Sequence, residues 1–166
     1  MQKDFLDDLA ELALGSRLKR LSERMLSDAA NIYQEFDLDV QPKWFTLLAL
    51  LHRKQRVNVV EASECLGLSQ PAISQFCRQL ADKGLVSFVV CEQDSRRKVL
   101  TLTPSGRDEV NKMLPMWLAV QKAAEQLCGE FENDFYRSLR KCEKALAAKS
   151  LQQRTAEAYH ELYGRP

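Results

Sequence analysis

The chain has few of the residues that build metal sites and hydrolytic centres. Its 166 residues include only two histidines, His52 and His160, and five cysteines without a CxxC pair. A zinc site of the usual ligand spacing is therefore not expected. GxSxG, P-loop and paired-carboxylate motifs are also missing, which argues against an enzyme. We predict no metal and no cofactor.

Long apolar runs are missing as well. No run approaches the roughly 20 residues that a membrane-spanning helix needs, and the opening MQKDFLDDLAELALG lacks the basic region of a signal peptide. The cysteines are odd in number and widely spaced, which is typical of reduced thiols. The chain has 45% hydrophobic and 28% charged residues, as ordinary soluble proteins do. We expect a cytoplasmic protein with no membrane partner.

The net charge is only +1, but the charges are unevenly distributed. Residues 40–60 hold four basic side chains and no acid, and residues 69–107 hold six basic against three acidic ones. Residues 1–13 hold four acids against one lysine. A basic middle and an acidic start are expected where one face of a protein meets a polyanion.

Apolar spacing predicts helices in the N-terminal part of the chain. Residues 14–36 carry an apolar residue every three or four positions, which predicts an amphipathic helix. Phe5, Leu9 and Leu12 extend the pattern upstream across Gly15, where a break is expected. Residues 43–54 are almost wholly apolar at their centre and predict a short buried helix, with Pro42 in its first turn.

The next segment has the start and stop signals of two consecutive short helices. Asn58 followed by Glu61 resembles a capping box, and Gly67 is a natural end for the first helix. Ser69 is a good N-cap for the second helix, and Pro71 falls in its first turn, where a missing N–H costs nothing. Two helices joined by the tight turn GLS predict a helix-turn-helix.

The second of these helices has an apolar and a polar face. Ile73, Cys77 and Leu80 have the spacing of an inner face. The other side carries small and hydrogen-bonding residues suited to base edges and phosphates in a major groove. The predicted DNA-binding residues of this helix are Ser69, Gln70, Pro71, Ala72, Ser74, Gln75 and Arg78.

A β-hairpin is predicted directly after the helix-turn-helix. Residues 85–90 and 98–103 are β-branched runs, joined by the polar loop CEQDSRR. Arg96 and Arg97 at the predicted tip are placed to enter a minor groove, whose negative potential attracts arginine. Asp94 is placed to orient Arg96 through a salt bridge.

The remainder is predicted to be helical. A long helix starts after Thr103 and continues to Gly129, with a kink rather than an end at Pro115. A further helix covers 131–146, and the polar residues after about 150 are expected to fray.

We therefore expect a mostly α fold with a small antiparallel β-hairpin wing. It forms one domain, in which 41–102 are a winged helix-turn-helix lobe and 1–40 and 103–166 a helical dimerisation region.

The segments VNVVEASECLGLSQPAISQFCRQLADKGLV and CEQDSRRKVLTLTPSG resemble the MarR family of winged-helix transcriptional regulators. The second matches that family's wing, where an Asp-x-Arg tip precedes a strand ending in Leu-Thr and then a glycine. A weaker resemblance extends over about residues 10–148. It implies a homodimer that binds a palindromic operator in double-stranded DNA as a repressor, with the helix residues above, Arg96 and its orienter Asp94 at the DNA.

The residues leave two alternatives open. Winged helices sometimes bind proteins instead of DNA, so a protein–protein interaction module is the second functional hypothesis. The apolar stripes on the terminal helices favour a dimer, although they would also close a monomeric bundle.

The family resemblance also implies a pocket for a small-molecule effector. Trp44, His52 and Trp117 are the candidates to line it, with ordinary core positions as the alternative. Peroxide-sensing members carry a reactive cysteine in their first helix, and residues 1–36 contain none.

Overall fold

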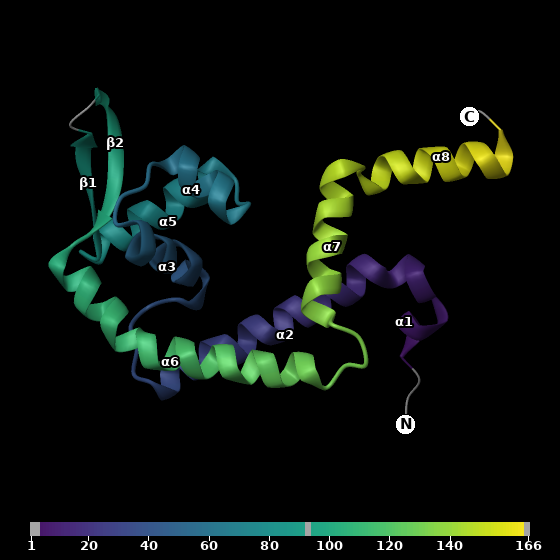
Figure 1. Cartoon of the computed structure of the whole chain (residues 1–166), viewed down its shortest axis with the longest axis horizontal. Coiled ribbons are helices and arrows are strands. Elements are labelled where there is room, and N and C mark those ends of the chain that lie inside the picture. The colour runs from purple at the N-terminus through teal and green to yellow at the C-terminus, as the bar shows by residue number, and fades with distance from the viewer. Residues whose placement is uncertain (1–3, 92–93, 165–166) are drawn as a thin grey trace. The chain divides into compact units, whose positions relative to one another are not determined.

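The computed structural model describes residues 4–91 and 94–164, apart from the side chains of residues 90–98. The chain divides into two compact units, residues 1–116 and 117–166. Figure 1 shows the order of the elements. They are α1 (Phe5–Asp8), the 3-10 turn η1 (Ala10–Ala13), α2 (Leu14–Glu35), the 3-10 turn η2 (Pro42–Trp44), α3 (Phe45–Lys54), α4 (Val59–Leu66), α5 (Gln70–Asp82), β1 (Val86–Cys91), β2 (Asp94–Leu102), α6 (Pro104–Gly129), α7 (Phe135–Ala148) and α8 (Leu151–Tyr163).

The elements α3, α4 and α5 and the β1–β2 hairpin gather into one lobe (Figure 1). Its core is apolar, and no buried residue is polar or charged in the part of the chain that the structure describes. Val57, between α3 and α4, exchanges backbone hydrogen bonds of 3.1 and 2.7 Å with Leu100 of β2, which attaches the hairpin to the helices. The fold class predicted from the sequence, mostly α with a two-stranded antiparallel wing, is confirmed.

Helix α4 starts with half of the predicted capping box. The Asn58 side chain accepts a hydrogen bond of 2.9 Å from the Glu61 backbone N–H. The Glu61 carboxylate does not return to Asn58 and instead pairs with Lys54 Nζ at 2.6 Å. Gly67 follows α4 with a φ of 64°, the left-handed conformation that glycine adopts without strain.

Two predicted boundaries are wrong near the N-terminus and in the wing. The break expected at Gly15 falls earlier, at η1, where Ala10 has a φ of 45°, and α2 runs through Gly15. Strand β2 starts at Asp94 rather than at residue 98, with Cys91 paired to Asp94. Strand pairing uses backbone groups, so polar side chains do not end a two-stranded ladder.

The C-terminal stretch is helical where we expected fraying. Ser150 and Gln153 form a reciprocal capping box at the start of α8, which satisfies two N–H groups at that helix end. Arg154 donates to the carbonyl oxygens of Ala145 and Lys149. Helix α6 continues through Pro115, consistent with the expectation that this proline does not end it.

The junction between α5, the hairpin and α6 is held by Thr103 and Gly106. The Thr103 hydroxyl donates to the Gly84 carbonyl at 2.6 Å and accepts from the Gly106 N–H at 2.9 Å. Gly106 is buried, and a Cβ built on it would lie 1.9 Å from the Leu85 carbonyl oxygen. Only glycine therefore fits at this position.

The variant Gly106→Ala should unfold more easily by about 3 kcal/mol or more, because its methyl group meets backbone that cannot rotate away. Gly15→Ala is the matched control, since its Cβ would meet nothing within 4 Å. Its free energy of unfolding should be unchanged or higher by up to about 1 kcal/mol. Urea unfolding of the two variants measures both effects, and equal stabilities would contradict this account of the junction.

Candidate nucleic-acid interface

Helix α5 is anchored by one face and exposed on the other. Ile73, Cys77 and Leu80 are buried in the lobe. At 3.6 residues per turn, Gln75 and Arg78 then lie on the opposite side of the helix, and both are exposed. Burial of Ile73 and Leu80 contributes about 2 kcal/mol each, so the apolar face decides which residues face solvent.

The predicted recognition residues lie together on and beside this exposed face. Ala72 and Ser74 are half-buried at its margins. The exposed members are Ser69, Gln70, Pro71, Gln75 and Arg78. Within the described part of the chain, the side chains of Gln70, Gln75 and Arg78 form no hydrogen bond or ion pair. Their donors therefore remain free to bind a ligand.

The start of α5 is shaped by Ser69 and Pro71. Ser69 has extended backbone, and its hydroxyl accepts from the Ala72 N–H at 3.4 Å, which is a long hydrogen bond. Pro71 stands in the first turn, where a backbone N–H would have no partner within the helix, so the missing N–H of proline costs nothing. The Ile73 N–H donates to the Ser69 carbonyl at 3.0 Å, so most N–H groups of this helix end are already bonded or absent.

Sequence reasoning missed two residues of α5. Asp82 is exposed on the same side as Arg78, one turn further on, so an acid limits the basic face at its C-terminal end. Gln79 is half-buried, and its Oε1 accepts a hydrogen bond of 3.1 Å from the indole N–H of Trp44. Helical spacing puts Gln79 at the edge of the polar face but does not indicate this partner.

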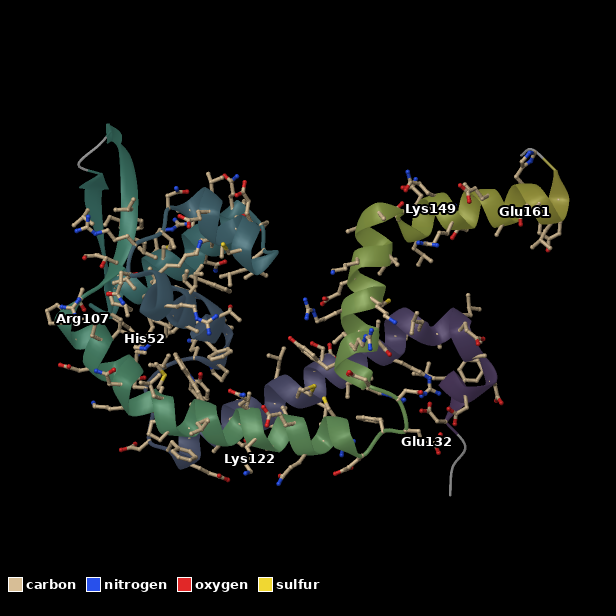
Figure 2. The ribbon with its side chains drawn as sticks, viewed as in Figure 1. His52, Arg107, Lys122, Glu132, Lys149 and Glu161 are labelled. Atoms are coloured by element: carbon tan, nitrogen blue, oxygen red, sulfur yellow. The ribbon has the colours of Figure 1, made fainter. Side chains whose placement is uncertain are left out.

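The three predicted effector-binding residues lie in different places. Trp44 is buried at 2% exposure and bonded to Gln79. His52 is half-buried on α3, where Figure 2 labels it. Trp117 is half-buried in the second unit. Their ligand-binding role stays a prediction.

The wing residues can be placed only by their backbone. Asp94, Arg96 and Arg97 belong to strand β2, and their side chains lie outside the described part of the structure. At the base of the wing, Arg107 (Figure 2) donates from Nη1 to the Leu102 carbonyl at 2.9 Å. This bond holds the end of β2 against the start of α6.

Two cysteines of the lobe differ in their exposure to solvent. Cys77 is buried, and burial raises its pKa to about 11, so it remains a protonated core residue near neutral pH. Cys65 is exposed on α4, with Lys54 Nζ 3.6 Å from its Sγ. The pKa of Lys54 is raised, first by its hydrogen bond to Glu61. The side chain of Cys91 is not described.

Known proteins match this lobe. Residues 38–97 match the model of the MarR family. This range contains α3, α4, α5 and β1, with the start of β2. Over these residues the chain is similar to the MarR family.

Solved structures with this fold extend the likeness beyond the winged helix. The chain is similar to MepR of S. aureus in a DNA complex, with 20% identity over 81% of this chain and 96% of that one and a TM-score of 0.65. It resembles the transcriptional repressor CouR, bound to a 23-mer DNA duplex, with 23% identity over 89% and 99% and a TM-score of 0.64. Bordetella bronchiseptica BpsR matches with 19% identity over 80% and 91% and a TM-score of 0.62. At these identities the likeness establishes the fold.

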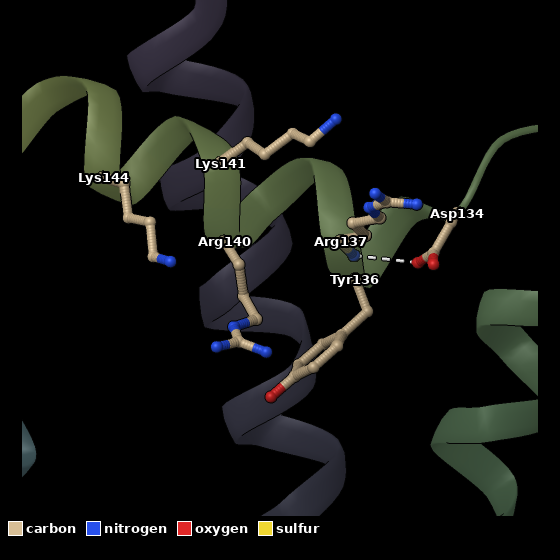
Figure 3. A pocket seen from close by; sticks show the side chains of 6 residues that line it. All are labelled: Asp134, Tyr136, Arg137, Arg140, Lys141 and Lys144. Atoms are coloured by element: carbon tan, nitrogen blue, oxygen red, sulfur yellow. Dashed lines mark hydrogen bonds between the residues drawn. The ribbon is translucent and has the colours of Figure 1, made fainter.

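Outside residues 38–97, α7 carries a second basic surface. Arg137, Arg140, Lys141 and Lys144 share one side of the helix around a hollow of about 550 Å³ (Figure 3). All six residues that line the hollow, including Asp134 and Tyr136, are exposed. The hollow holds no buried polar group that would fix a ligand, and we interpret it as a solvated helix face.

The described residues form neither a metal cluster nor a membrane-spanning helix. No cluster of three or more His, Cys, Asp and Glu side chains in them is placed to hold a metal ion. None of the helices formed by them is long and apolar enough to cross a membrane.

Burial of Cys77 predicts a pH-dependent stability of the lobe formed by α3, α4, α5 and the hairpin. The pKa of Cys77 is about 11 in the folded chain, against 9.0 for an ordinary cysteine thiol. The folded protein therefore keeps this proton to a higher pH than the unfolded chain does. The stabilisation is complete below pH 9 and is lost as the pH rises toward 11, by up to about 2–3 kcal/mol. Urea unfolding between pH 8 and 11 should show a steeper fall for wild type than for Cys77→Ala.

The control is Cys65→Ala, which keeps Cys77 and should keep the steep fall. Parallel pH profiles for wild type and Cys77→Ala would refute the assignment of this fall to Cys77.

Proposed function

We propose that the protein is a sequence-specific DNA-binding transcriptional regulator. The observation that supports this most directly is the exposed face of α5, where Gln75 and Arg78 keep their donors free opposite the buried face, with Gln70 exposed at the helix start. A major groove about 12 Å wide admits one such helix. Glutamine pairs bidentately with adenine and arginine with guanine, so these three residues are the proposed base-reading groups.

The other predicted residues would position the helix. The Ser69 hydroxyl at the start of α5 is proposed to contact a phosphate, and Pro71 and Ala72 permit close approach to a thymine methyl. Arg96 and Arg97 of the wing are proposed to enter the minor groove, with Asp94 orienting Arg96. The backbone of β2 supports the proposal by extending the wing out to Asp94.

A homodimer is proposed from the apolar stripe of α2. Leu14, Leu18, Leu21 and Met25 recur at helical spacing, and each is 38–52% exposed in the single chain. A row of large apolar side chains in water is costly, and a second copy would cover it. Two lobes related by a two-fold axis would contact a palindromic operator at half-sites about one helical turn, or a multiple of it, apart.

Regulation by a ligand is proposed by comparison. CouR is a repressor, and DNA binding of BpsR is regulated by 6-hydroxynicotinic acid. We propose a repressor that a small molecule releases from DNA by favouring a lobe spacing that does not fit the half-sites. His52 and Trp117 are the more accessible candidates for its contacts, since Trp44 is buried.

Replacement of Arg78 tests the DNA contact. Arg78→Ala should weaken binding to the operator by about 1–3 kcal/mol, because a base or phosphate contact is lost while the exposed site leaves folding intact. If the contact is to phosphate, the slope of log K against log salt falls by about one. Fluorescence anisotropy over a salt series measures both the affinity and the salt slope. The duplex is chosen by sequencing the DNA that the protein captures from its own genome.

Arg140→Ala is the matched control, because it removes an exposed arginine outside the winged helix. It should bind as wild type does. Wild-type affinity in Arg78→Ala would contradict the contact. A wild-type protein without salt-dependent duplex binding would favour the protein–protein interaction module.

Replacement of Leu21 tests the dimer. Leu21→Glu places a charge in the centre of the proposed interface, where burial of an unpaired charge is costly, and should produce monomers and a large loss of operator affinity. Ser27→Glu adds the same charge on the opposite side of α2 and should leave the dimer intact. Sedimentation velocity separates the two outcomes, and a dimeric Leu21→Glu would contradict this interface.

A further inference from the structure

The segment between α2 and α3 is attached to the recognition helix at two points. We call residues 36–44 the connector. Near its middle, Asp39 pairs with Lys83 at the end of α5, with 2.6 Å between Oδ2 and Nζ. At its end, the indole N–H of Trp44 donates to Gln79 Oε1 at 3.1 Å. The two contacts join the C-terminal half of α5 to a segment that lies more than 30 residues earlier in the chain.

The connector is itself tied to α2. The N–H groups of Phe36, Asp37 and Leu38 donate to the carbonyl oxygens of Ile32, Gln34 and Tyr33 respectively, at 3.0–3.2 Å. Tyr33 and Val40 are buried at 6% and 5% exposure. A change in the position of α2 therefore reaches the connector directly.

The two attachments differ in strength. The side chain of Asp39 is 97% exposed, so water and salt screen its pairing with Lys83. Trp44 is 2% exposed, and its N–H would lose its partner without Gln79. A buried donor left unpaired is costly, so the Trp44–Gln79 bond is the contact that restrains α5.

Gln79 is well placed to control the reading face. It is next to Arg78 and one turn after Gln75, so a rotation of α5 about this point moves these two of the three proposed base-reading side chains. A small displacement is enough to break a hydrogen bond to a base edge, because such bonds form only over a narrow range of distances and angles.

We infer that Trp44 and Gln79 are positioning residues, which set the orientation of the recognition helix against α2 and thereby the sequence specificity of DNA binding. This inference rests on the proposed function. It assigns to Trp44 a structural contact with the reading helix, in place of a contact with an effector. The pair would also couple any ligand-induced shift of α2 to the reading face.

The test uses Gln79→Met, which keeps the length of the side chain without a good acceptor, and Trp44→Phe, which keeps an aromatic ring without the donor. Each variant is first shown to be folded by circular dichroism. Binding to the captured operator duplex and to an unrelated duplex of equal length is then measured over a salt series.

Both variants should bind the operator about tenfold more weakly and the unrelated duplex within about twofold of wild type, since nonspecific binding depends on phosphates. The salt slope should be unchanged, unlike the slope for a lost phosphate contact. The double variant should lose no more than either single one, because the same bond is removed. Asp39→Asn, the control at the exposed attachment, should change operator binding less than about twofold.

The bond itself has a separate measurement. In the wild-type protein the Trp44 indole N–H should exchange slowly with deuterium, and in Gln79→Met it should exchange faster, with Trp117→Phe used to assign the resonance. Folded variants that bind the operator within about twofold of wild type would overturn the inference while leaving the proposed function standing. A wild-type protein that binds no duplex would overturn both, and the exchange experiment would still report whether the bond exists.

Discussion

The apolar contact of Ile73, Cys77 and Leu80 with the lobe is the constraint on which the proposed interface depends. These three side chains are 0–1% exposed, and a helix that buries one face must present the other. The free donors of Gln75 and Arg78 are thus a consequence of packing. A substitution that weakened this contact would disturb recognition even if every polar side chain remained.

Much of the lobe could be predicted because local signals and packing agree in it. Asn58, Gly67, Ser69 and Pro71 act at helix ends through their own backbone or side chains, so sequence spacing is enough to place them. The hairpin was predicted for the same reason. Its length was underestimated, because the residues from Asp94 onward are polar and β pairing does not require apolar side chains.

The tertiary contacts of the site could not be predicted from the sequence. Gln79 and Trp44 are 35 positions apart, and nothing in their local context indicates that a half-buried amide meets an indole. Glu61 shows the same effect, since Lys54 competes successfully with Asn58 for its carboxylate. The C-terminal helix α8 was underestimated because its polar composition hid a capping box at Ser150.

The connector suggests how one chain can combine a stable reading helix with a response to distant changes. The apolar anchor fixes which face of α5 is exposed, whereas the bond from Trp44 adjusts the orientation of α5 relative to α2. The first contact is large and non-directional, and it tolerates small shifts. The second is a single directional bond, so a modest displacement of α2 breaks it before the lobe core is disturbed. If an effector acts by moving α2, specificity for the operator should therefore be lost while the lobe remains folded.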